Sequence, residues 1–272
     1  MSLQISSINS GSNGNCYYVG NQQDAVLIDV GISCREIEKR MIRSGLSMDK
    51  VRAIFISHEH IDHIRGVEVL HRKYNLPVYI NDKTYENCRI KLQEELLNGF
   101  DDEEIIKIKS LHVIPFVKSH DAADPYSFSV ISNGIRVGVF TDIGTVCDKL
   151  KNHFSQCHAA FLEANYDDEM LETGPYPIYL KNRIRSNQGH LSNVQALELF
   201  QNHKSDLLSH IILAHLSKEN NSPELVQELF SNDAGNVNVF VASRLIESPV
   251  FSIGPNGAES FLDPTEQIAI QF

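Results

Sequence analysis

The sequence predicts an α/β protein in which β-strands and α-helices follow one another along 272 residues. Short apolar runs rich in Val and Ile have the length of buried strands, and segments of helix length lie between several of them. Several of these runs end in His or Asp. Chemistry is usually placed on loops that a rigid scaffold holds, so this pattern is typical of a sheet with a functional site at its strand ends.

The first half of the chain is expected to begin with strands and to continue with strands and helices in turn. Ser10 to Asn15, between the first two strands, is rich in small residues and lacks the Gly-Lys-Ser/Thr of a P-loop. This turn is either a simple hairpin turn or a nest of backbone N–H groups that holds a phosphate. Thr84 is the expected N-cap of the third helix. The expected strands are 3–9, 16–19, 25–28, 51–56 and 77–80, and the expected helices are 33–44, 65–74 and 84–97.

The second half of the chain contains two clear local signals. Asn133-Gly134 separates two apolar runs and predicts a tight hairpin. Ser192 and Gln195 have the spacing of a capping box, which predicts a helix start. The expected strands are 111–118, 126–131, 135–140, 159–164, 211–214, 237–241 and 249–253, and the expected helices are 175–186, 192–202 and 223–231.

Composition limits the class of protein. Apolar and charged residues make up 42% and 22% of the chain, and no linker or repeat divides it, so we expect one domain over residues 1–272. No apolar run approaches the roughly 20 residues that span a bilayer, so no membrane partner is expected. The N-terminus has no basic segment followed by an apolar stretch, so no signal peptide is expected. Five scattered cysteines without a Cys-x-x-Cys pair predict reduced thiols and a cytoplasmic location.

The net charge of −11 counts against extensive non-specific binding of nucleic acid, because phosphate groups favour a basic surface. A local basic channel remains compatible with this charge, and bound metal ions would add positive charge at a site. No feature of the sequence indicates an oligomeric state.

The main candidate site follows the expected strand at 51–56. Three histidines and an aspartate lie within six residues there: His58, His60, Asp62 and His63. Side chains two apart in an extended segment point the same way, so His58 and His60 can face one metal ion. Asp62 and His63 come after the chain has begun to turn and can face a second ion. The alternative is a polar surface loop, but imidazole and carboxylate at this spacing suit zinc, iron or manganese.

Two further candidates stand at strand ends. His120 follows the expected strand at 111–118 and is either a third ligand of the first ion or an ordinary surface histidine. Asp142 follows the expected strand at 135–140 and is either a carboxylate that bridges two ions or a helix cap.

The order His-x-His-x-Asp-His, followed by His120 and Asp142, resembles the metallo-β-lactamase superfamily. The resemblance implies an αββα sandwich, with two mixed β-sheets flanked by helices and the site between the two halves. It places the last metal ligand at His215, and it implies that Asp29 supports the metal loop without binding an ion. His58, His60 and His120 would hold one divalent ion and Asp62, His63 and His215 a second, with Asp142 between them. Zinc is the first choice of metal, with manganese or iron as alternatives.

Several shorter stretches resemble the YycJ/WalJ group of bacterial hydrolases, which is similar to ribonuclease Z-like phosphodiesterases. These stretches are 10–16, 163–167, 182–186, 189–193 and 214–220. The resemblance implies a dinuclear-metal-dependent phosphodiesterase or nuclease that acts on nucleic acid through a metal-bridging hydroxide, with 5′–3′ DNA exonuclease activity as one form. Asp62 would take a proton from the attacking water, and His190 would act on the scissile phosphate.

Contacts to the substrate are assigned more loosely. Lys181, Arg183 and Arg185 form either a solvated basic face of a helix or a contact to phosphates, with Lys181 and Arg185 on the same face. Ser12 and Asn13 would contact a phosphate if their turn forms a nest. The alternative function is a glyoxalase II-like hydrolase of thioesters or other small molecules, which would use the same metal ligands without His190.

Overall fold

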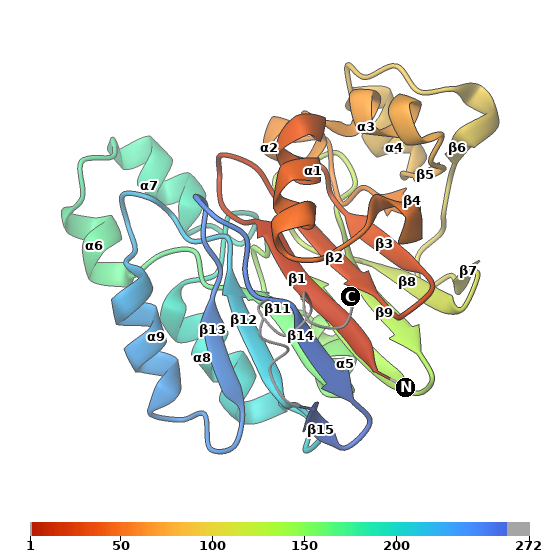
Figure 1. Ribbon diagram of the computed structural model, residues 1–272. Helices are drawn as coiled ribbons and strands as arrows, with labels where there is room; N and C mark the ends of the chain where they lie inside the picture. Colours follow the sequence, from red (N-terminus) through yellow and green to blue (C-terminus); the bar gives the residue numbers. More distant parts are fainter. Residues whose placement is uncertain (1, 260–272) are drawn as a thin grey trace.

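Two β-sheets pack face to face in the computed structural model, which describes residues 2–259 of the chain (Figure 1). The first sheet has eight strands in the order β15-β14-β1-β2-β3-β4-β5-β6, and the second has seven in the order β13-β12-β11-β10-β9-β8-β7. Helices cover the outer face of each sheet (Figure 1). The αββα sandwich predicted from the sequence is confirmed.

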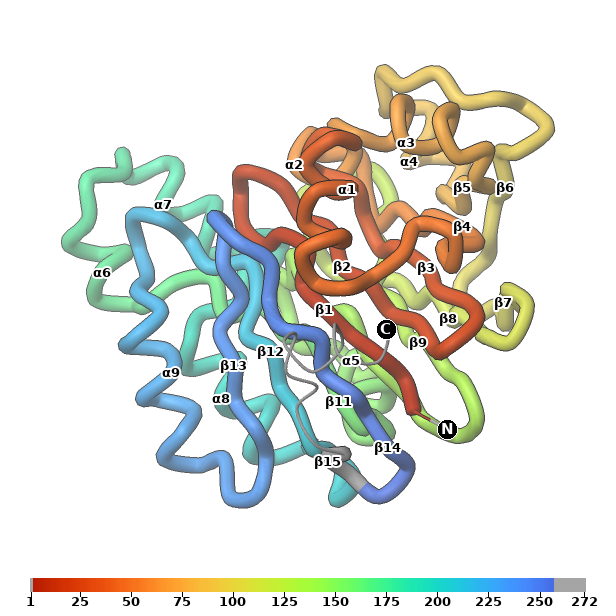
Figure 2. The backbone as a smooth tube through the Cα atoms, in the orientation of Figure 1, coloured from red at the N-terminus to blue at the C-terminus, as the bar shows by residue number. Residues whose placement is uncertain are grey.

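The first sheet is built mainly from the N-terminal part of the chain. Its strands β3 to β6 are parallel to one another, and its remaining neighbours are antiparallel. Figure 2 shows the chain returning to this sheet at its end, where β14 lies beside β1. The strands are β1 (Leu3–Asn9), β2 (Cys16–Gly20), β3 (Ala25–Ile28), β4 (Val51–Phe55), β5 (Val78–Tyr79), β6 (Leu97–Asn98), β14 (Phe251–Gly254) and β15 (Gly257–Glu259). The helices of this half are α1 (Cys34–Arg43), α2 (Ile61–Ile64), α3 (Val67–Tyr74) and α4 (Asp82–Asn87), with short 3₁₀ turns η1 (Met48–Lys50) and η2 (Glu94–Leu96).

The second sheet combines an antiparallel meander with a parallel half. Strands β7 to β10 are antiparallel, and β10 to β13 are parallel. The strands are β7 (Ile106–Ile108), β8 (Leu111–Val117), β9 (Tyr126–Ser132), β10 (Ile135–Phe140), β11 (Ala159–Glu163), β12 (His210–Ala214) and β13 (Asn238–Val241). The helices of this half are α5 (Asp148–Phe154), α6 (Asp168–Thr173), α7 (Ile178–Ile184), α8 (Asn193–His203) and α9 (Pro223–Ser231).

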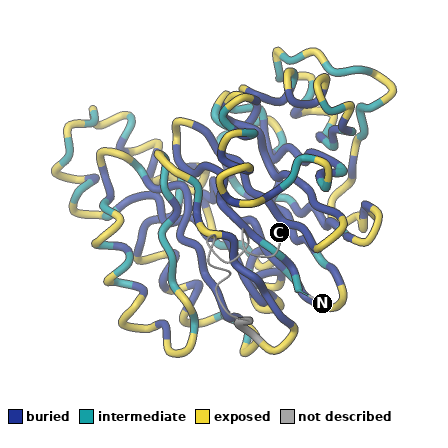
Figure 3. Tube along the Cα trace, viewed as in Figure 1, coloured by how far each residue is buried: buried dark blue, intermediate teal, exposed yellow. Residues whose placement is uncertain are grey.

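Alternation along the strands explains the layers. In β4, Ala53 and Phe55 face the apolar core between the two sheets, whereas Ile54 packs against the helices on the outer face. A strand buried on both faces in this way needs apolar residues at every position. Figure 3 shows both sheets buried and the outer sides of the helices and loops exposed.

Most of the predicted elements are confirmed within one or two residues. The Asn133-Gly134 turn has positive φ at both residues, 50° and 79°, as a type I′ hairpin requires. The capping box of Ser192 and Gln195 is present at the start of α8. The predicted helix at 65–74 is confirmed as α3, and a further short helix, α2, precedes it within the histidine-rich loop.

The predicted helix at 84–97 is wrong. Only α4 is α-helical there, with the short 3₁₀ turn η2 further on, and the N-cap of α4 is Asn81, whose side chain accepts from the backbone N–H of Lys83. Thr84 is buried, and its hydroxyl donates to the carbonyl of Asp124 at 3.1 Å. The chain after α4 packs apolar side chains against the outer core of the first sheet and then adds β6 to that sheet. Tertiary packing therefore overrides the local helix propensity of this segment.

Other details of the fold were not predicted. No residue range was predicted for helices α2, α5 and α6 or for strands β6, β7 and β15. Residues 1 and 260–272 of the expected domain lie outside the described residues. Across the described part of the chain, no helix combines the length and the apolar character that a membrane span requires.

Candidate metal centre

The candidate site lies where strand ends from both sheets meet. Asp29 and the cluster at 58–63 follow the parallel strands β3 and β4 of the first sheet. Asp142, Glu163 and His215 stand at the ends of the parallel strands β10, β11 and β12 of the second sheet. Parallel strands place their carboxyl ends at one edge of a sheet, so each sheet presents a row of polar side chains to the other.

Three histidines form the first group. His58 Nε2 lies 3.1 Å from His60 Nδ1, and the rings of His58 and His120 are 4.9 Å apart between centroids. One ring nitrogen from each of the three lies within 4.8 Å of the others, so the group could hold a metal ion. His60 comes from the loop after β4 and His120 from the loop after β8, so the two sheets contribute jointly.

Asp62, His63 and His215 form the second group, which could also hold a metal ion. The Oδ2 atom of Asp62 lies 3.6 Å from His63 Nε2 and 3.6 Å from His215 Nε2. His63 and His215 are buried, and Asp62 is partly exposed. Access to the second group is therefore from the side of Asp62.

The carboxylate of Asp142 stands between the two groups. Its oxygens lie 3.3 Å from His63 Nε2, 3.5 Å from His215 Nε2 and 3.8 Å from His120 Nε2. Only 2% of its surface is exposed. A buried carboxylate needs charged partners, and this one has imidazoles from both groups around it.

The unpaired atoms of the centre fit a metal ion. Within residues 2–259, the buried atoms His120 Nε2, Asp142 Oδ2 and His215 Nε2 make no hydrogen bond. Buried polar atoms are normally satisfied, and atoms left open at one place call for a further partner. Since imidazole nitrogens and carboxylate oxygens are the donors that zinc prefers, the residues present fit a divalent cation.

Asp29 lies behind the centre and holds His63. Its Oδ2 atom lies 2.7 Å from His63 Nδ1 and 2.8 Å from the hydroxyl of Ser57, and its Oδ1 atom accepts from the backbone N–H of Ser57. The Ser57 hydroxyl also lies 2.8 Å from His58 Nδ1. These contacts leave the Nε2 atom of His63 directed at Asp62 and Asp142, which is the geometry expected of a supporting carboxylate.

Glu163 plays the corresponding part in the second sheet, and no role was predicted for it from the sequence. Its Oε1 atom lies 2.8 Å from His190 Nδ1 and 3.0 Å from His215 Nδ1. Its Oε2 atom accepts from the backbone N–H groups of Ile143 and Leu191 at 2.7 and 3.1 Å. Its position at the end of a buried strand, which it shares with Asp142 and His215, was the feature of the sequence that could have identified it as a site residue.

The turn at 10–15 braces the centre. The Ser10 hydroxyl accepts from the backbone N–H of His215 at 2.8 Å, and Asn15 Nδ2 lies 3.1 Å from His63 Nε2 and 3.3 Å from Asp62 Oδ2. A Cβ on Gly31 would lie 1.7 Å from the carbonyl oxygen of Asp62, so only glycine allows this close approach. The turn therefore links β1 and β2 of the first sheet to residues at the ends of β4 and β12.

Three residues of the centre have a left-handed backbone. Asp29, Asp142 and His215 have φ values of 60°, 56° and 56°, each directly after a strand. A non-glycine residue in this region carries strain of order 1–3 kcal/mol, and such residues cluster at functional sites. The left-handed step turns the chain sharply where the strand ends, and the buried side chains of these residues meet in the centre.

The charges of the centre shift its pKa values in opposite directions. Burial alone would raise the pKa of Asp62, but His63 and His215 lower it to about 2. Burial would lower the pKa of His215, but Asp142, Asp62 and Glu163 raise it to about 10. The cluster at neutral pH therefore combines ionised carboxylates with a protonated His215, whose positive charge a cation can replace.

A cavity of about 180 Å³ opens beside the centre. His190 and His215 line it together with Ser12 and Arg183. The side chain of His190 is 20% exposed, in contrast to the buried histidines around it. The remaining lining residues are Asp121, Asn165, Tyr176, Leu180, Ile184, Gly189 and Ser217.

The three basic residues of α7 and its C-cap differ in position. Among the described residues that line the cavity, Arg183 is present and Lys181 and Arg185 are absent. Arg183 Nε donates to Asp121 Oδ2 at the rim. Lys181 is buried with its Nζ on the carbonyl of Glu172, and Arg185 Nη2 lies 2.8 Å from Glu172 Oε2. The face expected from the sequence, with Lys181 and Arg185 together, points to Glu172 instead of the centre.

The two turn residues proposed for substrate contact also differ. Ser12 lines the cavity, whereas the side chain of Asn13 donates to the carbonyl of Arg244 at 2.9 Å. The backbone N–H groups of Gly11, Gly14 and Asn15 are hydrogen-bonded within the protein. The turn therefore serves as a brace, and its amides are largely used for that purpose.

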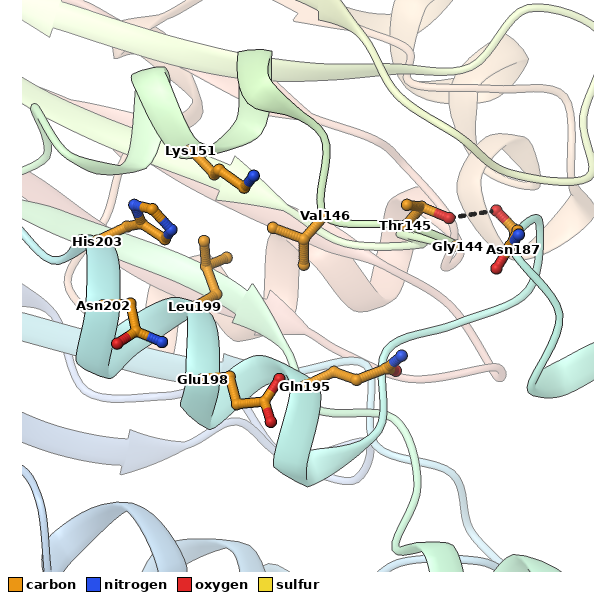
Figure 4. Close-up of a pocket in the computed structure, with 10 residues that line it drawn as sticks. All are labelled: Gly144, Thr145, Val146, Lys151, Asn187, Gln195, Glu198, Leu199, Asn202 and His203. Carbon is orange, nitrogen blue, oxygen red and sulfur yellow. Dashed lines mark hydrogen bonds between the residues drawn. The ribbon is translucent and has the colours of Figure 1, made fainter.

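A second cavity, of about 330 Å³, is lined in part by the loop that follows Asp142, at Gly144, Thr145 and Val146 (Figure 4). Thr145 Oγ1 donates to the carbonyl of Asn187 at 2.9 Å (Figure 4), and a Cβ on Gly144 would lie 2.3 Å from the same oxygen. These contacts join the loop after β10 to the loop that carries His190. The cavity itself is lined by α8 and by Lys151 and does not include a residue of the centre.

A sandwich of two mixed sheets with a His- and Asp-rich centre at the strand ends defines the metallo-β-lactamase fold. Residues 24–215 match the family model described as a beta-lactamase superfamily domain, and the chain belongs to this family. The resemblance inferred from the sequence is thereby confirmed.

Several known proteins are similar to this chain over most of its length. Exodeoxyribonuclease YycJ from Bacillus anthracis is 34% identical over 275 residues and covers 100% of both chains. Exodeoxyribonuclease WalJ from Streptococcus pneumoniae serotype 2, strain D39, is 31% identical and covers 94% of this chain and 96% of that protein. Among solved structures, the metallo-beta-lactamase fold protein YhfI from Bacillus subtilis has a TM-score of 0.72 at 14% identity, covering 93% of this chain and 100% of that chain. This structural likeness confirms the fold.

Removing the charge of Glu163 should weaken metal binding. We expect Glu163→Gln to lower zinc affinity by about 10- to 100-fold, because a carboxylate that orients a ligating imidazole has an effect of this size. Competition with a chromophoric chelator measures the affinity. Glu103→Gln is the matched control, since Glu103 lies 3.2 Å from His153 in a pair outside the centre. Equal zinc affinity in Glu163→Gln and the wild type would exclude this role for Glu163.

Zinc affinity should also rise with pH. An imidazole must be neutral to bind a metal, so at any pH below the raised pKa of His215, about 10, binding displaces its proton. Each proton released makes the apparent affinity rise by about tenfold per pH unit. Titrations with zinc at pH 6, 7 and 8 test this, and a pH-sensitive dye reports the proton release. Affinity that stays constant over this range would contradict a protonated His215.

Proposed function

We propose that this chain is a dinuclear-metal-dependent phosphodiesterase that degrades DNA as an exonuclease. The observation that carries the proposal is a pair of side chains outside the expected ligand set, His190 and Arg183, that line the cavity beside the centre. An imidazole and a guanidinium next to two cations suit the negative charge of a phosphodiester. The full-length relatives named exodeoxyribonucleases support DNA as the substrate and a single domain as the organisation.

The proposed ligands follow the two groups of the centre. His58, His60 and His120 would hold the first ion, and Asp62, His63 and His215 the second, with Asp142 bridging them. Zinc is the first choice, with manganese or iron as alternatives. Bound divalent ions supply Lewis acidity at the scissile phosphate and ionise water at neutral pH.

Asp62 and His190 would act as the general base and the general acid. Asp62 is ionised at neutral pH and partly exposed at the open side of its group, so it can accept the proton of the attacking water. Because His190 Nδ1 lies on Glu163 Oε1, its Nε2 atom is left for the substrate. In its protonated form, this atom can donate to a phosphate oxygen or to the leaving oxygen.

Arg183 would bind a neighbouring phosphate oxygen. It is held at the rim by Asp121, which itself lies 3.3 Å from His120 Nε2. The guanidinium is more than half exposed, so its ion pair with Asp121 is weak and open to exchange for a phosphate.

We also propose a cytoplasmic location, since a DNA substrate and the five free cysteines both fit a reducing compartment.

The main test is an activity assay with matched variants. Purified protein with zinc or manganese is given end-labelled single- and double-stranded DNA and RNA, bis(p-nitrophenyl) phosphate and a thioester. We expect metal-dependent release of nucleotides from DNA, and the product ladder gives the 5′–3′ or 3′–5′ direction. We expect His190→Ala to lose about 10²- to 10⁴-fold in kcat with its metal content intact, and Asp62→Ala to be inert.

The outcomes separate the candidate functions. Thioester hydrolysis without nucleotide release would replace the proposal by the glyoxalase II-like alternative. Loss of metal from His190→Ala would show that His190 is a ligand and would remove its role at the phosphate.

Arg183 and Arg185 provide a matched pair of variants. Both belong to the end of α7 and both pair with a carboxylate, but only Arg183 lines the cavity. We expect Arg183→Ala to raise KM for DNA by about tenfold or more, the size of a lost charged hydrogen bond, and Arg185→Ala to change it by less than about twofold. Steady-state kinetics on a single-stranded oligonucleotide measure both values. Equal effects of the two variants would exclude a specific contact by Arg183.

A further inference from the structure

A third cavity, of about 370 Å³, lies beside the centre at the ends of β12 and β13. Strands β10 to β13 are parallel, and the first three deliver Asp142, Glu163 and His215 to the centre. The fourth, β13, ends at Val241 and delivers residues 241–245 to this cavity. The cavity is therefore the next position along the same edge of the sheet, where open α/β sheets bind ligands.

The cavity adjoins the one at the centre. Ser217 lines both, and Leu216 follows His215 directly. Ser10, which accepts from the backbone N–H of His215, also lines the third cavity. A ligand with its reacting group at the centre can therefore extend along Ser217 into this space.

The lining combines apolar walls with positive charge. Lys218 and Arg244 are its charged residues, and no carboxylate occurs among the described residues that line it. Lys218 is 71% exposed, and its one ion pair with the described residues is to the exposed Glu219, so a phosphate can readily replace that partner. The apolar lining residues are Leu216, Pro223, Val241, Ala242 and Leu245.

Arg244 is held firmly in place. Its Nη2 atom donates to the carbonyl of Leu216, and a Cβ on Gly11 would lie 3.2 Å from that nitrogen. Gly11 has φ of 131°, so its backbone favours glycine, and a side chain there would also press on the guanidinium. The cation is thus part of the cavity wall, next to the turn at 10–15.

The one amide side chain among the described lining residues is unsuited to reading a base. The side chain of Asn221 donates to Ala164 and Asn193 and accepts from Asn193 and Ser222. Its amide is therefore fully used within the protein. The apolar part of the wall can contact the flat face of any base, because this contact does not depend on the hydrogen-bonding edge of the base.

We propose that this third cavity binds the nucleoside next to the scissile phosphate, with its base against the apolar wall at Leu245 and its outer phosphate near Lys218. The proposal rests on the proposed DNA exonuclease function and specifies where the strand continues from the centre. The volume lies within the roughly 300–1,000 Å³ of small-molecule sites, so one nucleoside fits without a change of fold. An enzyme that removes nucleotides from any sequence needs this kind of unselective subsite.

Leu245 and Ile246 give a closely matched test. Both are exposed apolar residues, 75% and 61%, but only Leu245 lines the cavity among the described residues. We expect Leu245→Glu to raise KM for a single-stranded DNA oligonucleotide by about tenfold, since the apolar contact with the base is lost and the new charge repels phosphate. Ile246→Glu carries the same charge one residue away and should change KM by less than about twofold. Leu245→Phe should retain or lower KM, because it keeps the apolar contact and adds an aromatic ring that can stack on a base.

Lys218 is tested through the salt dependence of binding. We expect Lys218→Ala to reduce the slope of log affinity against log salt by about 0.7, the contribution of one contact to single-stranded DNA. Lys151→Ala, at the separate cavity of Figure 4, removes a partly exposed lysine that also pairs with an acidic neighbour, Asp148, and should leave the slope as it is. Anisotropy of a labelled oligonucleotide with calcium in place of the catalytic metal measures the affinity.

The outcomes are distinguishable. A wild type that releases nucleotides, with Leu245→Glu and Ile246→Glu alike in KM, overturns the subsite and leaves the proposed function standing. A wild type that releases no nucleotides from DNA overturns both. A rise in KM confined to Leu245→Glu, together with a lower salt slope confined to Lys218→Ala, supports the subsite.

Discussion

Burial of the Asp142 carboxylate among imidazoles from both sheets is the interaction on which the centre depends. An isolated buried carboxylate is costly, and here His63, His120 and His215 surround it within 3.8 Å. Each imidazole is held by a partner of its own. Asp29 holds His63 and Glu163 holds His215, and the carbonyl of Gly189 holds His120. The fold supplies this arrangement by ending parallel strands of both sheets at one edge and turning the chain sharply at each end.

Much of the site could be predicted because its residues follow strands with strong local signals. The runs before His58, His120, Asp142 and His215 are apolar and β-branched, so strand and strand end could both be located from the sequence. The turn chemistry at Asn133-Gly134 and the capping box at Ser192 were equally local. These features depend on residues that are adjacent in the chain, so the local sequence is enough to predict them.

The features that could not be predicted depend on distant contacts. The segment at 84–97 has helix-forming residues, but most of it packs irregularly on the outer core and ends in an edge strand. The role of Glu163 could not be predicted from its position at a strand end. It depends on His190 and His215, which are distant in the sequence and meet its carboxylate only in the folded protein. Helical spacing predicted that Lys181 and Arg185 act together. In the structure both residues contact Glu172, whereas Arg183 contacts Asp121 beside the centre.

The position of the centre between the sheets has a mechanical consequence. Ligand candidates come from the first sheet at 58–63 and from the second at His120, Asp142 and His215. An ion held by both would act as a cross-link that resists sliding of one sheet over the other. Since anything that binds only the native state shifts the folding equilibrium, metal supply would set the rigidity of the whole sandwich as well as its chemistry. Chelation would then loosen the alignment of the two halves before either sheet loses its own hydrogen bonds.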